Sequence, residues 1–251
     1  QWGESCLVKL NGMFAFAIYD KLNKSLFIAR DRFGIKPLYY YTDGSQFIFS
    51  SEITPLLNTL PDNKKSVNDQ SIHDYLVHSR TDQSEQTFYQ HILKLQHGHS
   101  ITLSDGKIEF KRWYHLEQRL GSPYESATEY RNALSSSISL QLRSDVPIGV
   151  SLSGGLDSSS IVSLLLKDHN KTNPTTFSAV YAPGESGDES RFIELFRKQV
   201  NNMHLTRPTA ESLLTDIPSF VRAHEEPVQS TGPYAQYKVM ELASRHVKVT
   251  L

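Results

Sequence analysis

A glycine- and serine-rich segment in the middle of the chain reads Ser153-Gly154-Gly155-Leu156-Asp157-Ser158-Ser159. It follows an apolar run over residues 148–152 that predicts a strand, and it leads into residues 157–167, whose apolar spacing predicts a helix. Two adjacent glycines let backbone N–H groups come close to an anion, and the N-terminus of the helix adds partial positive charge. The segment therefore predicts a phosphate-binding loop between a strand and a helix.

The polar side chains of this loop refine the prediction. Ser153, Ser158 and Ser159 offer hydroxyl donors to phosphate oxygens, whereas the carboxylate of Asp157 would repel them. An acidic residue fits beside phosphates when a divalent cation bridges the two, so we expect Asp157 to be a ligand of Mg²⁺. The loop is not a Walker A motif, because no Gly-Lys-Ser/Thr ends it. The alternative is a plain glycine turn that joins a strand to a helix.

Strands and helices alternate around this loop. Predicted strands cover residues 148–152, 175–181 and 204–207, and another begins at Val247. Predicted helices cover residues 126–142, 157–167, 188–201, 213–224 and 233–246. Alternation of this kind predicts a parallel sheet covered by helices on both faces.

The first hundred or so residues predict a different class of fold, because short strands and turns dominate them. The expected hairpins pair residues 13–20 with 25–30, 38–41 with 46–50, and 100–103 with 107–113. Short helices are expected after Ser51 and after Asn68 or Asp69. Gly121-Ser122-Pro123 breaks the pattern. We therefore expect an antiparallel, sheet-rich α+β domain over residues 1–118 and a parallel-sheet α/β domain over residues 119–251.

Composition limits the class of protein. Among 251 residues, 26 Lys+Arg face 27 Asp+Glu, and the formal net charge is −1, which gives no general attraction to nucleic acids or acidic membranes. No apolar run approaches the roughly 20 residues that cross a bilayer. The single Cys6 cannot form an internal disulfide. A cytoplasmic location therefore fits best.

Two stretches of the first half carry a resemblance to a known family. They read Leu10-Asn11-Gly12-Met13-Phe14-Ala15-Phe16-Ala17 and Arg30-Asp31-Arg32-Phe33-Gly34-Ile35-Lys36-Pro37-Leu38-Tyr39-Tyr40. Together they resemble the later half of a class II glutamine amidotransferase domain of the N-terminal-nucleophile type. The loop at residues 153–159 resembles the SGGxDS signature of the PP-loop ATP pyrophosphatases, whose fold is adenine nucleotide α-hydrolase-like. In this order, the motifs resemble the glutamine-hydrolysing asparagine synthetase family over nearly the whole chain.

The resemblance implies an ATP-dependent amide ligase. Its substrates would be glutamine, aspartate and ATP: ammonia from glutamine would attack an aspartyl adenylate formed with ATP and Mg²⁺, giving asparagine, AMP and pyrophosphate. The residues that it places around ATP are Leu152, Ser153, Gly154, Gly155, Asp157, Ser158, Ser159 and Ala179. Leu152 and Ala179 would lie near the adenosine, although both are equally compatible with ordinary core positions at strand ends. A homodimer is one assembly that the resemblance allows.

The chain departs from the family pattern at both ends. The family's glutaminase nucleophile is a Cys at the mature N-terminus, upstream of this chain, so we assign no catalytic residue here. Cys6 is instead expected to be a small buried hydrophobic residue. A second loop for pyrophosphate would follow Leu251. We therefore expect an internal piece of a longer protein, without glutaminase activity and with part of the ATP site.

Two other functions stay open. A related amidotransferase acting on another carboxylate would share every motif above, because the residues that bind the acceptor would lie largely beyond Leu251. A non-catalytic nucleotide-binding or scaffold protein is the second, and an intact loop with Asp157 argues against it. Relatives have an acidic-Pro element on the acceptor side where this chain has Glu225-Glu226-Pro227, and we expect no catalytic role for it.

Overall fold

The chain divides into two compact units, each with its own hydrophobic core. The computed structural model describes residues 2–121, 123–171, 173–182, 184–185 and 187–251, so that Ser122 of the predicted break lies outside the described residues. Unit 1 consists of Gln1–Gly121 and His224–Gln229, and unit 2 consists of Ser122–Ala223 and Ser230–Leu251. We call the short returning segment His224–Gln229 the strap.

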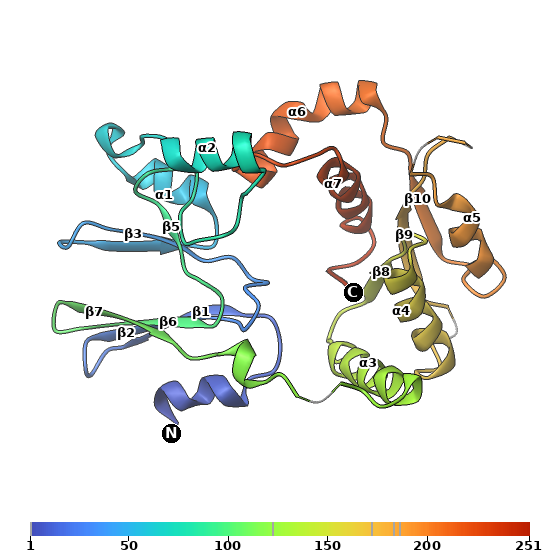
Figure 1. The fold of residues 1–251 in the computed structure, drawn as a ribbon, viewed down its shortest axis with the longest axis horizontal. Coiled ribbons are helices and arrows are strands. Elements are labelled where there is room, and N and C mark those ends of the chain that lie inside the picture. The colour runs from blue at the N-terminus through green and yellow to red at the C-terminus, as the bar shows by residue number, and fades with distance from the viewer. Residues whose placement is uncertain (1, 122, 172, 183, 186) are drawn as a thin grey trace. The chain divides into compact units, whose positions relative to one another are not determined.

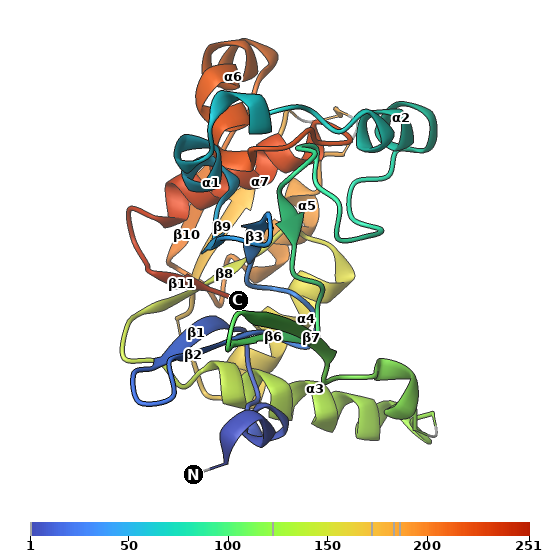
Figure 2. The ribbon, with the colours of Figure 1, turned by 90° about the vertical axis from the view of Figure 1, so that its left-hand side faces the viewer.

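The first sheet of unit 1 is antiparallel and is built from two hairpins. Its strand order is β1 (Ala15–Asp20), β2 (Ser25–Arg30), β6 (His99–Ser104) and β7 (Lys107–Arg112). Ala15 pairs with Arg30 in the first hairpin, and His99 pairs with Arg112 in the second. Figure 2 shows these strands side by side. Both predicted hairpins are confirmed, with bounds that shift by two residues or fewer.

A second, smaller sheet packs on the first. It has the order β4 (Phe47–Ser50), β3 (Tyr39–Thr42) and β5 (Leu93–Lys94), and the predicted hairpin between β3 and β4 is confirmed. Ile28, Tyr40 and Ile101, all buried, form the core between the two sheets. On the other face of β3, α1 (Ile53–Thr59) buries Ile53 and Leu56, so unit 1 is layered, as Figure 1 shows.

The remaining elements of unit 1 are mostly short helices. They are η1 (Gly3–Lys9), η2 (Asp62–Lys64), α2 (Asp69–His78) and η3 (Leu116–Gln118). Helix α2 begins where the sequence predicts, because the Asn68 side chain accepts a hydrogen bond from Ser71 N at 3.2 Å and caps it. The 3-10 helix η1 was not expected, and its Glu4 carboxylate accepts hydrogen bonds from Thr102 and Lys111 of the first sheet.

Unit 2 contains a parallel sheet, as the alternating pattern predicts. Its strand order is β10 (Met203–Thr206), β9 (Thr175–Ala179), β8 (Ile148–Ser151) and β11 (Val249–Thr250), and all three pairings are parallel. Side chains of Val150, Leu152 and Val162 belong to the core on one face. Phe177 belongs to a separate core on the other face.

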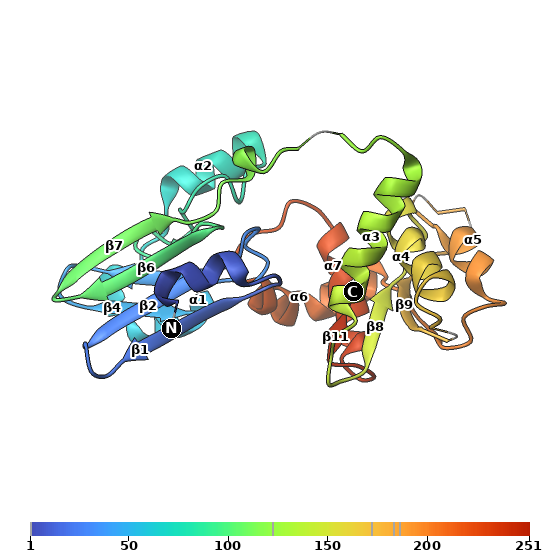
Figure 3. The same ribbon diagram turned by 90° about the horizontal axis from the view of Figure 1, so that it is seen from below.

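Helices cover both faces of this sheet. They are α3 (Ala127–Gln141), α4 (Leu156–Lys167), α5 (Ser190–Ile193), α6 (Ala210–His224) and α7 (Gly232–Ala243). Figure 3 shows α4 and α7 on opposite sides of β8 and β9. Ser126 Oγ caps α3 by accepting from Glu129 N at 3.1 Å, and the Glu129 carboxylate accepts from Glu125 N.

One predicted helix is wrong in extent. The sequence predicts a helix over residues 188–201, whereas the structure has α5 followed by a 3-10 turn, η4 (Glu194–Phe196). Ile193 and Val200 are both buried in the same core, and Phe196 packs against it. No glycine or proline marks the break, so tertiary packing overrides the helical spacing here. None of the described helices is long and apolar enough to cross a membrane.

Candidate nucleotide-binding site

The strand that precedes the predicted phosphate loop is fixed in the interior of unit 2. Leu152, the residue after β8, is fully buried. Its N–H donates to the Phe177 carbonyl at 2.9 Å, and Ser178 Oγ donates to the Leu152 carbonyl at 2.5 Å. The loop therefore begins at a defined point beside the end of β9.

The loop turns at Gly154, whose φ is +91°. A side chain there would be strained, and its Cβ would lie 2.9 Å from the Glu189 carbonyl oxygen. Gly155 has ordinary extended backbone (φ −66°) and is the N-cap residue of α4. A strand, a positive-φ glycine and a helix N-terminus thus follow one another as the sequence predicts, in the arrangement that holds anions in many proteins.

The serine hydroxyls gather at this helix N-terminus. Ser153 Oγ and Ser158 Oγ are 3.0 Å apart, and Ser158 Oγ also donates to the Gly155 carbonyl at 3.2 Å. Gly155 N donates to Ser153 Oγ at 3.3 Å. Ser159 N continues the helix by donating to the Gly155 carbonyl at 3.1 Å. Phosphate oxygens can accept hydrogen bonds from the same hydroxyl and N–H groups.

A cavity of about 200 Å³ opens at the carboxyl ends of β8 and β9. It brings together three of the predicted residues, Leu152, Ser153 and Ala179. The start of α7 supplies Gly232, Ala235 and Gln236 to the same cavity. The other lining residues are Ser151, Phe177, Ser178, Tyr181, Gly187, Glu189 and Val239. Ligands of open α/β sheets bind at this end of the strands.

Three further predicted residues, Gly154, Gly155 and Ser159, line an adjacent cavity of about 610 Å³ beside α5 and η4. Of the predicted set, Asp157 and Ser158 line neither cavity among the described residues. Asp157 is exposed on the first turn of α4, and Ser158 is engaged with Ser153. Residues of the loop thus line two cavities, with Ser153 at the smaller one and Gly154, Gly155 and Ser159 at the larger one.

The donor set suits a magnesium ion that is shared with phosphates rather than one held by protein alone. No group of three His, Cys, Asp or Glu residues within the described part of the chain could hold a metal. Mg²⁺ in nucleotide sites is held by one or two carboxylates, substrate phosphates and waters. The exposed carboxylate of Asp157, on the first turn of α4, fits that kind of binding.

The sequence places Asp188-Glu189-Ser190 at a helix start, with a nucleotide contact as a weaker possibility, but it does not single out Tyr181 or Gln236. Tyr181 N is held by Asp188 Oδ1 at 3.2 Å, and Ser190 N donates to the same oxygen at 3.3 Å. The hydrogen bond from Ser190 Oγ is the largest cause that lowers the pKa of Asp188 below its ordinary value, so this carboxylate stays charged and fixes the turn after β9. Gln236 enters from α7. Tyr181 ends a predicted strand and Gln236 lies near the start of a predicted helix, and no other feature of the sequence marks either residue as part of a site.

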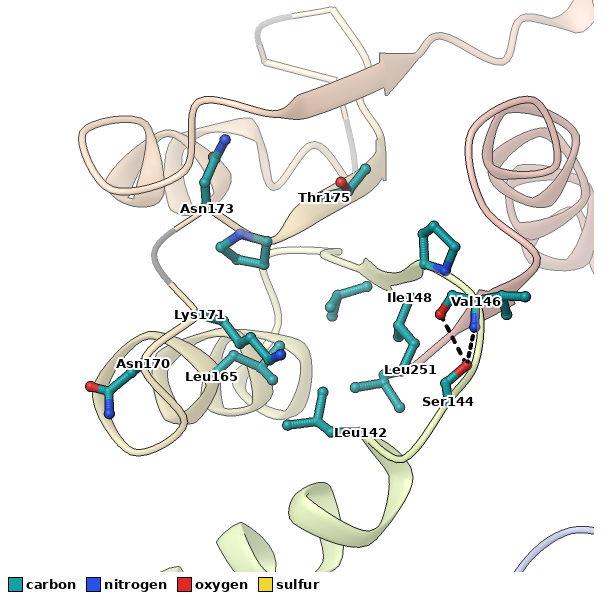
Figure 4. A pocket seen from close by; sticks show the side chains of 13 residues that line it. Leu142, Ser144, Val146, Ile148, Leu165, Asn170, Lys171, Asn173, Thr175 and Leu251 are labelled. Carbon is teal, nitrogen blue, oxygen red and sulfur yellow. Dashed lines mark hydrogen bonds between the residues drawn. The ribbon is translucent and has the colours of Figure 1, made fainter.

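Another cavity, of about 460 Å³, lies at the opposite end of the sheet (Figure 4). Ile148 and Thr175, which begin β8 and β9, line it together with Leu251, Lys171 and Asn173. None of the predicted ATP residues is among those that line it. Because it is at the amino ends of the strands, we do not take it as the nucleotide site.

The charged residues of the first-half motif build a loop in unit 1. The Arg30 guanidinium donates to the carbonyl groups of Lys36, Leu95 and Gly34 at 2.6–2.7 Å. The buried Asp31 carboxylate accepts four backbone N–H groups, those of Phe14, Phe33, Ile35 and Lys36. Both side chains are saturated by backbone groups, which is a structural role.

Cys6 occupies a different position from the one expected. It lies on η1 and is half-buried rather than fully buried, so the expectation of a core cysteine is only partly met. Leu7, the next residue, is the buried member of this turn. We assign Cys6 no catalytic role.

In the comparisons with known proteins, different family models match the two halves of the chain. A family model of the glutamine amidotransferase domain matches residues 1–114, and a family model of asparagine synthase matches residues 129–251. A Bacillus subtilis protein named glutamine-hydrolyzing asparagine synthetase 1 is 31% identical over 99% of this chain and 39% of its own length. A Methanocaldococcus jannaschii protein, provisionally named glutamine-hydrolyzing asparagine synthetase 2, is 32% identical over 99% of this chain and 49% of its own length.

A relative with another name also matches. The Gibberella zeae protein named amidase chry2 is 30% identical over 85% of this chain and 34% of its own length. Among solved structures, an allosteric regulatory enzyme of purine biosynthesis matches with a TM-score of 0.28 and 12% identity over 81% of this chain and 48% of that one, too low to support an argument. The chain spans about half the length, or less, of the curated relatives that it matches. With both halves matched in order, the chain belongs to the glutamine-hydrolysing asparagine synthetase family.

Proposed function

We propose that this chain is part of an ATP-dependent amide ligase that makes asparagine from aspartate, glutamine and ATP. The first half belongs to the domain that releases ammonia from glutamine, and the second half to a PP-loop domain that binds ATP. The residues proposed to contact ATP are Leu152, Ser153, Gly154, Gly155, Asp157, Ser158, Ser159 and Ala179. The observation that carries the proposal is the placement of the glycine-serine loop between β8 and α4, beside a cavity at the carboxyl ends of the strands.

The proposed reaction takes place in two steps. A carboxylate oxygen of aspartate attacks the α-phosphorus of ATP, and the bond between the α-phosphorus and the bridging oxygen breaks, so pyrophosphate leaves. Ammonia then attacks the acyl carbon, loses a proton, and displaces AMP, leaving asparagine. In this scheme the loop N–H groups and the hydroxyls of Ser153 and Ser158 hold phosphate oxygens in place and stabilise charge on the leaving pyrophosphate.

Magnesium belongs to the same proposal. Asp157 would hold the ion, which would supply positive charge that neutralises the triphosphate. Leu152 and Ala179 have a different proposed task, which is to place the adenosine against backbone at the ends of β8 and β9. We further propose that the enzyme acts in the cytoplasm, and that a homodimer is an assembly to test by light scattering.

Replacing Asp157 tests the role of the loop. In Asp157→Ala, the affinity for ATP with Mg²⁺ should fall about tenfold or more, because the metal loses its protein ligand. The affinity for ATP without Mg²⁺ should stay equal or rise, because a negative charge near the phosphates is gone. Isothermal titration calorimetry with and without Mg²⁺ measures both.

The matched control is Asp145→Ala, which removes an exposed carboxylate between α3 and β8. It should leave both affinities unchanged. Equal loss of binding with and without Mg²⁺ in Asp157→Ala would contradict the metal role. A wild-type chain that binds no ATP in either condition would end the ligase proposal.

A second candidate is a ligase that uses the same adenylation on another carboxylate. One observation favours keeping it: a relative that matches 85% of this chain is named as an amidase. Pyrophosphate release by the full protein with aspartate and with other carboxylic acids separates the two. Release that depends on aspartate alone would remove the second candidate.

A further inference from the structure

Helix α7 runs along the sheet of unit 2 from the end that carries the candidate nucleotide cavity. Its first turns line that cavity, at the carboxyl ends of β8 and β9. Val239, farther along α7, belongs to a buried cluster with Phe177 of β9, and Ala179 packs against this cluster. A Cβ at Gly149, near the start of β8, would lie 3.1 Å from Cγ2 of Val247, which follows α7. Helix α7 is therefore antiparallel to the strands that it covers.

One face of α7 forms a wall of the cavity. Its members are Gly232, Ala235, Gln236 and Val239, whose spacing of three and four residues is that of a single helix face. Gln236 is the member of this face whose side chain can form hydrogen bonds. Its side chain is exposed, so the amide is accessible to a ligand in the cavity.

The neighbouring polar side chains of α7 are directed to α6 instead. Tyr234 Oη donates to Asp216 Oδ2 at 2.8 Å, and Lys238 Nζ donates to the same oxygen at 3.0 Å. Gln236 lies two residues from each of them, so it projects from roughly the opposite side of the helix. Within the described part of the chain, the Gln236 amide has no hydrogen-bonding partner. Its donor and acceptor atoms are therefore available to a ligand.

Gln236 lies level with Ala179 along the direction of the strands. It precedes Val239 by three helical residues, a rise of about 4.5 Å, and Ala179 follows Phe177 by two strand residues, a rise of about 6.6 Å. Because α7 is antiparallel to β9 and Val239 packs with Phe177, both steps lead in the same direction. Gln236 and Ala179 line the same cavity. Gln236 is thus next to the residue that we propose to lie near the adenosine.

An amide in an otherwise apolar part of the cavity is suited to recognise a purine base. Leu152, Ala179 and Val239 contribute apolar side chains to the lining, against which a flat base can pack. The Gln236 amide accepts with Oε1 and donates with Nε2. This pair of groups matches the 6-amino group of adenine and the acceptor nitrogen beside it.

We propose that Gln236 is a specificity-determining residue whose amide recognises adenine, with Oε1 accepting a hydrogen bond from the 6-amino group. The inference rests on the proposed function, because it concerns the base of the nucleotide that the cavity is proposed to bind. It adds a side chain of α7 to a set of proposed ATP contacts that otherwise comes from residues 152–159 and Ala179.

Calorimetric titration of the whole chain with two nucleotides tests the proposal. The nucleotides are ATP and purine riboside triphosphate, which lacks only the 6-amino group, each with Mg²⁺. The wild-type chain should bind ATP about tenfold more tightly, because the analogue leaves the acceptor atom of Gln236 without a donor. In Gln236→Ala the affinity for ATP should fall about tenfold, and the ratio of the two affinities should approach one.

Two variants are controls. Gln236→Glu retains an acceptor oxygen and should keep the preference for ATP over the analogue, while its negative charge lowers the affinity for both nucleotides. Gln141→Ala removes an exposed amide at the end of α3, which is not among the described residues that line the cavity, and it should change neither affinity.

The outcomes separate this inference from the proposed function. Equal affinity of the wild-type chain for the two nucleotides overturns the inference without any variant. A preference for ATP that persists in Gln236→Ala also overturns it, and so does an equal fall for both nucleotides, because the side chain would then not sense the 6-amino group. Both results leave ATP binding, and with it the proposed function, intact. A wild-type chain that binds neither nucleotide overturns the proposed function and the inference together.

Discussion

At Gly154 the backbone and its neighbours leave no space for a side chain. The φ of +91° strains any L-residue, and a Cβ would lie 2.9 Å from the Glu189 carbonyl oxygen and 3.0 Å from Glu189 Cβ. The next residue, Gly155, has ordinary φ, and its nearest contact for a Cβ would be Ser153 Oγ at 3.4 Å. Two glycines that are alike in sequence therefore tolerate substitution differently.

Alanine at each position measures this difference. Gly154→Ala should cost about 1–3 kcal/mol of unfolding free energy and weaken ATP binding, since the turn must shift away from Glu189. Gly155→Ala, the matched control, should change stability by less than about 1 kcal/mol. Urea unfolding followed by far-UV circular dichroism gives both values. Equal costs at the two positions would mean that the turn is not held in this conformation.

Asp31 predicts a dependence of stability on pH. Burial raises the pKa of its carboxyl, but the backbone N–H groups of Lys36, Ile35, Phe33 and Phe14 outweigh burial and hold the pKa below the ordinary 3.8. A lowered folded-state pKa stabilises the protein above the ordinary value, and this contribution is lost as the pH falls through the lowered pKa. The contribution is therefore fully present at neutral pH.

Asp31→Asn tests it. At neutral pH the variant should lose about 3 kcal/mol of unfolding free energy, because an amide cannot accept all four N–H bonds. The difference from wild type should shrink as the pH falls below 3.8. Urea midpoints from tryptophan fluorescence across this range are the measurement. Asp62→Asn, at an exposed carboxylate, is the control, and a gap that stays constant with pH would contradict the role of Asp31.

At the scale of single residues, the sequence predicts the local structure of the glycine-serine loop better than the contacts of the residues outside it. The glycine turn, the capping position and the grouping of Ser153 with Ser158 follow from local chemistry, and the structure has them. Ala179 lies near Leu152 because β9 pairs with β8, and the alternation of strands and helices in the sequence suggests such a parallel pairing. The contact roles of these residues with ATP stay predictions. Nothing local marks Glu225, whose partners are more than 170 positions away.

Among the elements, hairpins and capped helices were predictable and packing-driven turns were not. The turn residues between β1 and β2 and the cap of α2 act within a few residues, so sequence alone indicates them. The failure over residues 188–201 has the opposite cause, because the core contacts of Ile193 and Val200 come from elements elsewhere in unit 2. The strap is a further example. The sequence predicts a loop after α6, but it does not show which groups of unit 1 that loop contacts.

The strap gives a second pH-dependent prediction, of opposite sign. Desolvation raises the pKa of Glu226 above the ordinary 4.5, against the hydrogen bond from Phe88 N, which lowers it. The folded state is therefore relatively more stable below the ordinary value, and it loses stability as the pH rises from there through the raised pKa. An uncharged side chain of the same shape avoids this loss.

Glu226→Gln should therefore raise the unfolding midpoint of unit 1 relative to wild type at about pH 7.5, and the two should converge near pH 4. The glutamine carbonyl still accepts from Phe88 N, so the seat is retained. Tryptophan fluorescence in urea at the two pH values is sufficient. A variant that is less stable at both values would show that the carboxylate stabilises the strap through its charge, contrary to this prediction.

The two units have separate hydrophobic cores, and tryptophan fluorescence follows the unfolding of one unit only. Ile28, Tyr40 and Ile101 belong to the core between the sheets of unit 1, and Val150 and Val162 belong to that of unit 2. Separate cores favour separate cooperative transitions. The two tryptophans, at positions 2 and 113, both lie in unit 1, so their fluorescence follows unit 1 while circular dichroism follows both units.

Adding ATP with Mg²⁺ should therefore separate the urea transition measured by circular dichroism from the one measured by tryptophan fluorescence. At 100 times its dissociation constant, a ligand stabilises the unit that binds it by about 2.7 kcal/mol. The urea midpoint of the circular dichroism transition of unit 2 should rise accordingly, whereas the fluorescence midpoint should move little. Asp157→Ala should abolish the rise. An equal shift of both signals would mean that the two units unfold as one.

The seat of the strap has a practical consequence for anyone who divides this protein. Unit 1 is discontinuous in sequence, so a gene fragment that stops at Gly121 encodes it without the residues that satisfy the amides of Ile53, Thr54 and Phe88. Such a fragment should bind a synthetic hexapeptide with the sequence His-Glu-Glu-Pro-Val-Gln, supplied in trans, as a missing piece of itself.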